Sequence, residues 1–173
     1  YYVERRYEKD NYKGSDELAA QYVPLAEQFY ATYNALDLAL DNRNNELYNE
    51  RMTEYRGEKR ENAVNFIEIN LITAQTIDLI DPDGNTDTQK VESNLQQITQ
   101  RLNKLQPGTT PEVQNAVREY QDSVKEFVAE ARNYIIINSS YGEAYTQLFT
   151  KYNKMISKAN AVNMADLDVT EKK

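Results

Sequence analysis

Apolar and aromatic side chains recur through the stretch from Asp16 to Tyr55 at steps of mostly three and four residues. The positions are Leu18, Tyr22, Leu25, Phe29, Tyr33, Leu36, Leu40, Leu47, Tyr48, Met52 and Tyr55. Such steps place the side chains on one stripe of an α-helix, and a period near 3.5 is typical of coiled coils and elongated bundles. A helix of this length would extend roughly 60 Å. We therefore expect a long central helix with the rest of the chain packed alongside it.

Glycine and proline mark places where this helix is expected to start, bend or stop. Gly14-Ser15 predicts a break followed by an N-cap, after the end of an earlier helix in 1–13. Pro24 removes one backbone hydrogen bond and should bend the helix, unless the helix begins just before it. Gly57 either ends the helix or weakens it.

Four further segments carry helical patterns, separated by short turn signals. They cover residues 61–80, a stretch capped by Thr86 or Thr88, residues 112–136, and a last stretch from Tyr145 to Ala159. The 61–80 segment has the widest apolar stripe, so we expect it to be the most buried helix. The next has a regular 4-3-4-3 seam at Val91, Leu95, Ile98, Leu102 and Leu105.

Tyrosine is abundant, with 14 residues, and most of these lie on the apolar stripes. Examples are Tyr22, Tyr33, Tyr120, Tyr145 and Tyr152. We expect their rings in the core and their hydroxyl groups at its rim, because a buried phenol needs a polar partner.

The pattern as a whole predicts an all-α fold. Short loops make successive helices antiparallel, which indicates an elongated up-and-down bundle of four to five helices with one long, possibly bent central helix. With 5 glycines and 4 prolines the chain has too few turn residues for an all-β fold. We expect a single domain over 1–173, the C-terminal part of a longer protein, with 161–173 as a flexible tail.

The net charge and the hydropathy of the chain exclude some classes of binding partner. The 173 residues have a net charge of −8 and a mean hydropathy of −0.82. Nucleic acid and anionic membrane surfaces are disfavoured, because both attract clustered lysine and arginine. No apolar run approaches the 18 residues of a membrane-spanning helix. The chain begins with Tyr1 rather than Met, so we expect a processed or truncated product.

Cysteine and histidine are both absent. Their absence removes cysteine nucleophiles, Ser-His couples, zinc fingers and di-iron sites of the Glu-x-x-His type. The chemistry left is that of carboxylates, lysine, tyrosine and hydroxyl groups, and of hard cations bound through oxygen. We assign no catalytic, cofactor-binding or metal-binding residues.

The loop 81–92 has the ligand spacing of a calcium-binding EF-hand. Its oxygen-bearing side chains are Asp81, Asp83, Asn85, Asp87, Gln89 and Glu92. The required glycine at the sixth position is Thr86, and Pro82 occupies the second position. A turn followed by acidic residues at a helix start explains the same pattern and is the favoured interpretation.

Glu46, Glu50, Glu54 and Glu58 recur every four residues, and arginines are interleaved at Arg43, Arg51, Arg56 and Arg60. A pair of catalytic carboxylates would need burial at a set separation. Mixed charges at this spacing are more typical of a solvated helix face.

Several stretches resemble a known family. They are Tyr1-Tyr2, the segment 8–13, the long helix with its internal Pro24, the segment 49–59, and Lys151-Tyr152-Asn153-Lys154-Met155. Together they resemble the C-terminal two-thirds of the YiiG-like family of bacterial envelope lipoproteins, a helical domain of unknown function. The resemblance implies export, and attachment to the envelope through a lipidated cysteine upstream of Tyr1. It implies no catalytic residues.

These expectations favour a non-enzymatic, envelope-associated helical bundle that needs no cofactor. It would bind or scaffold an unknown envelope protein or ligand, in the periplasm or at the outer surface. It would contact the membrane only through an upstream lipid anchor and would not bind nucleic acid. The alternatives are a calcium-responsive module using the 81–92 loop, a carboxylate-dependent glycan hydrolase, and a cytosolic coiled-coil adaptor.

Overall fold

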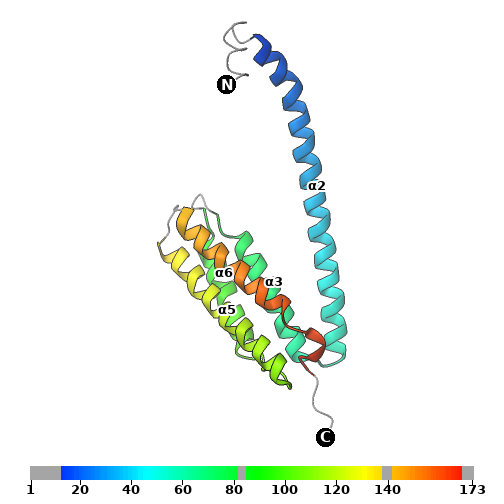
Figure 1. Cartoon of the computed structure of the whole chain (residues 1–173), viewed down its shortest axis with the longest axis vertical. Helices are drawn as coiled ribbons and strands as arrows, with labels where there is room; N and C mark the ends of the chain where they lie inside the picture. Colours follow the sequence, from blue (N-terminus) through cyan, green and yellow to red (C-terminus); the bar gives the residue numbers. More distant parts are fainter. Residues whose placement is uncertain (1–12, 82–84, 138–141, 169–173) are drawn as a thin grey trace. The chain divides into compact units, whose positions relative to one another are not determined.

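The structure, a computed structural model, describes residues 13–81, 85–137 and 142–168. Within these ranges the secondary structure is entirely helical, as expected (Figure 1). The elements are α2 (Lys13–Gly57), α3 (Glu61–Asp78), α4 (Thr88–Leu102), α5 (Pro111–Ile137), α6 (Gly142–Asn160) and the short 3-10 helix η1 (Met164–Asp166). The all-α bundle predicted from the sequence is therefore confirmed.

Helix α2 is one continuous element of 45 residues. It includes Gly14 and Ser15, so the expected break at these residues is wrong, and it continues through Pro24. The helix ends at Gly57, and Lys59 then adopts a left-handed backbone with φ of 57°. Three residues therefore connect α2 to α3.

The chain divides into two compact units, residues 1–49 and 50–173, where we expected a single domain. Most of α2 belongs to the first unit. Its last two turns belong to the second unit, together with α3, α4, α5 and α6.

The second unit is a four-helix bundle made of two helical hairpins (Figure 1). Helix α3 packs mainly on α4, and α5 mainly on α6. The seam expected in 91–105 is buried throughout, and so is that of α5; the α5 residues are Val113, Val117, Tyr120, Val124, Phe127, Ala131 and Tyr134. Half of α3 is buried, 9 of its 18 residues, in agreement with its wide apolar stripe.

The helix caps differ in one place from those expected. Asp87 caps α4, accepting a hydrogen bond from the Lys90 N–H at 3.1 Å, whereas we expected Thr86 or Thr88. Thr86 instead accepts a hydrogen bond from the Asp81 N–H at 2.9 Å and so closes the turn before α4. A carboxylate is the stronger acceptor at a helix N-terminus, because the helix dipole favours negative charge there.

Ion pairs join the bundle helices on their outer faces. Glu126 of α5 accepts hydrogen bonds from Lys151 and Lys154 of α6 at 3.0 and 2.7 Å. Glu92 of α4 accepts two from Arg132 of α5, at 3.1 and 3.2 Å. These cationic partners lower the pKa of both carboxyl groups, first through hydrogen bonds and then through charge.

Residues 161–168, which we assigned to a flexible tail, are packed on the bundle. Val162 and Leu167 are buried, with 7% and 1% of their surface exposed, and both belong to the core cluster. The segment contains η1, which is capped by Asn163. The rest of the expected tail, 169–173, lies outside the described residues.

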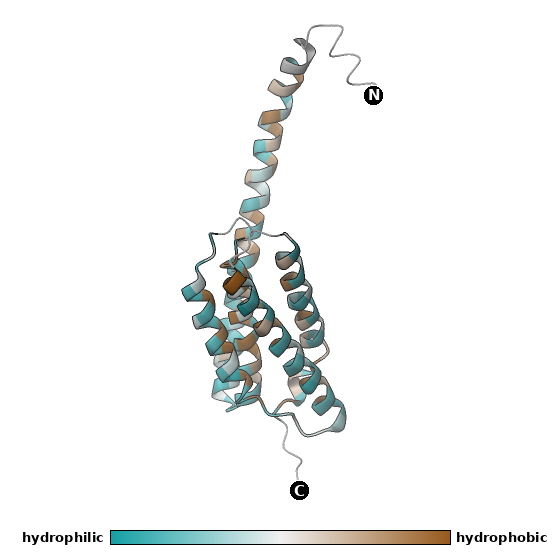
Figure 2. Cartoon of the chain, turned by 90° about the vertical axis from the view of Figure 1, so that its left-hand side faces the viewer, coloured by the Kyte–Doolittle hydropathy of each residue, from teal (hydrophilic) through white to brown (hydrophobic). Residues whose placement is uncertain are grey.

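The first unit presents its apolar stripe to solvent. Eight stripe residues are between 39% and 71% exposed: Leu18, Tyr22, Leu25, Phe29, Tyr33, Leu36, Leu40 and Leu47. The expectation that Tyr22 and Tyr33 are core residues is wrong, because the residues described in this unit, 13–49, form a single helix with no second element on which to bury a face. Figure 2 shows apolar segments recurring along α2.

Crossing a bilayer requires a helix that is both long and strongly apolar. None of the described helices combines the necessary length with the necessary apolar content.

Candidate functional site

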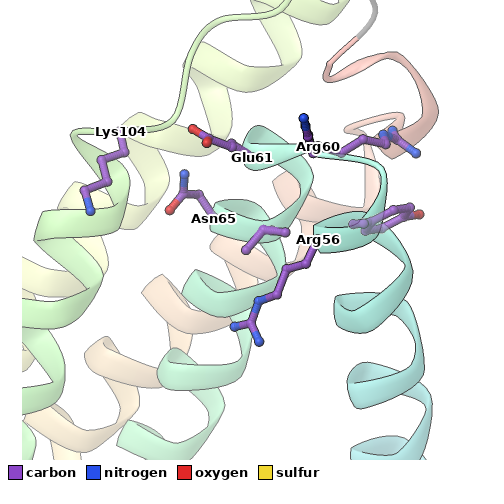
Figure 3. Close-up of a pocket in the computed structure, with 8 residues that line it drawn as sticks. Arg56, Arg60, Glu61, Asn65 and Lys104 are labelled. Atoms are coloured by element: carbon purple, nitrogen blue, oxygen red, sulfur yellow. The ribbon is translucent and has the colours of Figure 1, made fainter.

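A hollow of about 420 Å³ lies where α2 ends and α3 begins, within the second unit. Its walls come from three segments: the last turn of α2 with the residues that follow it, the first turns of α3, and the residues after α4 (Figure 3). The lining residues are Tyr55, Arg56, Lys59, Arg60, Glu61, Val64, Asn65 and Lys104.

The hollow is cationic although the chain has a net charge of −8. Arg56, Lys59, Arg60 and Lys104 line it, against a single carboxylate, that of Glu61. A local excess of positive charge in a concave surface is suited to an anionic group, such as a carboxylate or a phosphate.

Both arginines of the hollow already have partners. Arg56 donates to a carboxylate oxygen of Glu68 at 2.9 Å, and Arg101 of α4 pairs with the same carboxylate. Burial, and then the charge of Arg56, lower the pKa of Arg101. Through Glu68, these two pairs link the end of α2 and helix α4 to α3, so Arg56 is engaged in a structural ion pair.

Arg60 ties the hollow to the C-terminal segment. Its guanidinium lies 4.5 Å from the centre of the Tyr55 ring, a cation–π distance. It also donates hydrogen bonds to the main-chain oxygens of Met164 and Ala165, the latter at 3.2 Å. These contacts fix the orientation of the Arg60 guanidinium, because its planar N–H groups donate in defined directions.

The start of α3 is capped by a residue 106 positions away. The Asp168 carboxylate accepts hydrogen bonds from the N–H groups of Asn62 and Ala63, at 2.9 and 3.0 Å. The residue at the N-cap position itself, Arg60, makes no side-chain capping bond. A carboxylate at a helix N-terminus satisfies free N–H groups and complements the helix dipole.

Lys59 and Lys104 are the cations of the hollow that remain for a ligand. Their side chains make no hydrogen bond or ion pair with any of the residues that the structure describes. Two ammonium groups on flexible stems can attract an anion but do not fix its orientation. The arrangement therefore supports weak anion binding.

The 81–92 loop uses its carboxylates for structural contacts. Asp87 caps α4 and pairs with the Lys90 ammonium at 3.1 Å, and these contacts lower its pKa. Glu92 is bound to Arg132. Asp83 lies outside the described residues. Among those described, no three acidic side chains gather in a way that would hold a metal ion.

The carboxylates of 46–58 lie on an exposed face, in agreement with the preferred interpretation. Glu46 pairs with Arg43 at 3.0 Å, and their side chains are 65% and 58% exposed. Glu58 lies 3.8 Å from Arg60 and is 54% exposed. Such exposed pairs contribute little to stability, because water competes for both charges.

Sequence reasoning did not find the hollow, Lys104 or the capping role of Asp168. These residues come together only through contacts between distant segments. One signal was present: Arg60 precedes α3 at a position where a capping side chain is usual, so the N–H groups of α3 required a partner from elsewhere.

No protein-family model, curated protein or solved structure matches the chain. The family resemblance drawn from the sequence therefore stays a prediction.

Proposed function

We propose that this chain is a non-catalytic binding or scaffolding module of the bacterial cell envelope, attached to the membrane by a lipid on a cysteine upstream of Tyr1. One observation carries the binding role: a well-packed bundle is joined in sequence to a helix with eight apolar side chains that are 39–71% exposed. Exposed apolar surfaces of this extent are typical of interaction sites. The resemblance to the YiiG-like family supports the envelope location.

Mass spectrometry on the N-terminal peptide of the native protein, from fractionated cells, tests the location. The proposal expects a diacylated or triacylated cysteine in the membrane fraction. An unmodified N-terminus in the cytosolic fraction would contradict it and favour a cytosolic coiled-coil adaptor.

Activity assays with the purified chain test the non-catalytic role. No turnover of envelope glycans is expected. Saturable turnover abolished by a single substitution, Glu54→Gln or Glu58→Gln, would establish a carboxylate-dependent hydrolase instead.

Calcium titration tests the remaining alternative. Binding through the 81–92 loop would require Glu92 to exchange Arg132 for the ion, and Asp87 to leave the N-terminus of α4. We expect no heat at millimolar Ca²⁺. Heat that is lost in the Glu92→Gln variant would favour a calcium-responsive module.

A further inference from the structure

The exposed stripe of α2 follows a repeat of 11 residues. Leu18, Phe29 and Leu40 begin successive repeats (18, 29, 40), and Leu25, Leu36 and Leu47 follow the same spacing (25, 36, 47). Eleven residues in three turns, about 3.67 per turn, stay close to the 3.6 of a straight α-helix. The stripe therefore runs almost parallel to the helix axis from 18 to 47, a length of about 44 Å.

Between Leu18 and Asn42, charged side chains lie away from this stripe. Between Leu18 and Asn42 the charged residues are Glu27, Asp37 and Asp41. At about 100° per residue, each lies roughly 80° or more around the helix from the middle of the stripe. From Leu18 to Asn42, the same face of another copy can therefore pack on the stripe without bringing charges together; beyond Asn42, Arg43 lies on the stripe.

The charge of the far side argues against a lipid surface as the occupant. Helices that lie on membranes carry lysine and arginine on their polar face. Here no lysine or arginine occurs between Lys13 and Arg43. The carboxylates of that side would be repelled by anionic headgroups.

The bundle of the same chain offers no matching apolar surface among the residues described. Its large exposed apolar side chains there are Ile136 and Ile137, at the end of α5. Among the described residues, the long apolar face that can cover the stripe is therefore the same stripe on a second copy of the chain. Eight side chains of this exposure would bury on the order of 800 Å² per copy, the amount found in stable interfaces.

We propose that α2 is a dimerisation helix, and that the stripe 18–47 of one copy packs antiparallel on the stripe of a second copy. This inference builds on the proposed binding role and names the partner. In the antiparallel register Leu18 faces Leu47 of the other copy, Leu25 faces Leu40, and Phe29 faces Leu36. The two-fold axis passes near Tyr33.

The position of Arg43 favours an antiparallel over a parallel pair of α2 helices. Arg43 lies within the width of the stripe, about 40° from its middle. In a parallel pair it would face the same arginine of the other copy. In the antiparallel register it faces Tyr22, whose exposed ring provides a cation–π partner.

The first test is sedimentation equilibrium of the full chain between about 1 and about 100 µM, a range in which a Kd of micromolar order or tighter gives a dimer. A dimer is expected, and a monomer throughout the range would overturn the proposal. Two leucines on opposite sides of α2 give matched variants: Leu36 on the stripe, 59% exposed, and Leu38 away from it, 63% exposed.

Leu36→Glu should raise the dimer Kd by about 30-fold or more, because a carboxylate is then buried without a partner. Leu38→Glu should change it by less than about two-fold, as expected for surface substitutions. Equal effects of the two variants would overturn the stripe as the interface. Because both side chains are exposed, both variants are expected to retain the folded bundle, which far-ultraviolet circular dichroism checks.

Disulfide cross-linking tests the orientation, and the 173 residues contain no cysteine to interfere. An L25C copy mixed with an L40C copy should form a cross-linked dimer on mild oxidation, while L25C alone should not. Rapid cross-linking of L25C with itself would show a parallel pair and overturn the antiparallel assignment. Neither readout depends on the lipid anchor or on the absence of turnover, so the proposed function can fail separately.

Discussion

Helices α2 and α5 carry the same kind of apolar pattern but use it in opposite ways. The seam of α5 is at most 7% exposed from Val113 to Tyr134, whereas the stripe of α2 is 39–71% exposed from Leu18 to Leu47. Both patterns correctly indicate a helix with one apolar face. The difference is that α5 has α4 and α6 to pack on within its own unit. An amphipathic pattern therefore specifies a face and leaves its partner open.

Tyrosines show the same contrast at single positions. Tyr120 of α5 is fully buried, its hydroxyl donates to the Asn70 side-chain oxygen at 3.1 Å, and its ring lies 4.7 Å from that of Phe66. Tyr33 of α2 occupies an equivalent stripe position and is 57% exposed. Aromatic residues on a helix stripe thus serve as core residues or as interface residues, depending on which elements the fold places beside them.

The largest expected difference in unfolding free energy is between two phenylalanine-to-alanine variants. Phe127→Ala, at a fully buried position of α5, should lower the free energy of unfolding of the bundle by about 3–5 kcal/mol, because it leaves a cavity. Phe29→Ala, at a position 65% exposed, should lower it by less than about 0.5 kcal/mol. Hydrogen exchange of the α4 and α5 amides measures both. A comparable loss in the two variants would show that the stripe of α2 is part of the same cooperative core.

Gly108 and Gly57 should differ in how well they tolerate an added side chain. Gly108 lies in the turn before α5, and Gly57 ends α2. Gly108 has φ of 76°, and a Cβ there would lie 2.5 Å from the Val113 Cγ1, whereas a Cβ at Gly57 would meet nothing within 4 Å. Gly108→Ala should therefore destabilise the bundle by about 1–2 kcal/mol. Gly57→Ala should be close to neutral. Urea unfolding followed by circular dichroism distinguishes them, and a neutral Gly108→Ala would mean that the turn before α5 can rearrange.

Removing the Asp168 carboxylate, which caps α3, should have a smaller effect on the free energy of unfolding. Asp168→Ala should cost about 1 kcal/mol, because two N–H groups at the start of α3 lose their acceptor. Asp168→Asn keeps one acceptor oxygen and should cost less. Faster hydrogen exchange should be confined to the first turn of α3 and the residues after α6. If exchange there does not change, the segment 161–168 does not hold α3 in solution.

Acid should weaken the bundle through its outer ion pairs. The folded pKa values of Glu126 and Glu92 lie below their ordinary value of 4.5. Their contribution is therefore complete above about pH 4.5 and is lost as the pH falls through the lowered folded values. The urea midpoint should decrease over this range, and less so in a Glu126→Gln variant. An identical acid dependence in that variant would assign the loss to other carboxylates.

Local patterns identified the helices of the bundle with little error. The seam at Val91, Leu95, Ile98 and Leu102 was correct at every position, since each turn of an amphipathic helix repeats the same requirement. The predictions were wrong where burial depends on which other segment of the chain a residue contacts. Tyr22 and Tyr33 were expected in the core, and 161–168 was expected to be flexible, because neither the exposure of α2 nor the contact of Asp168 with α3 is encoded within a few residues of sequence.

The hollow could not be predicted for the same reason. Arg56 and Arg60 were identified as members of a charged helix face, but Lys104 is more than 40 positions away and the main-chain acceptors of Arg60 lie further still. Only the antiparallel arrangement of α3 and α4 brings Lys104 to the start of α3. No spacing rule connects these residues.

The sequence by itself determined that the fold is all-α, which residues form each bundle helix, and which face of each helix is apolar. The tertiary structure decided which apolar faces are buried, that a distant carboxylate caps α3, and where four cations surround a hollow. The physical reason is the range of the interactions. Periodicity, capping and turn preferences act over a few residues, whereas burial and ion pairing depend on which segments the whole chain brings together.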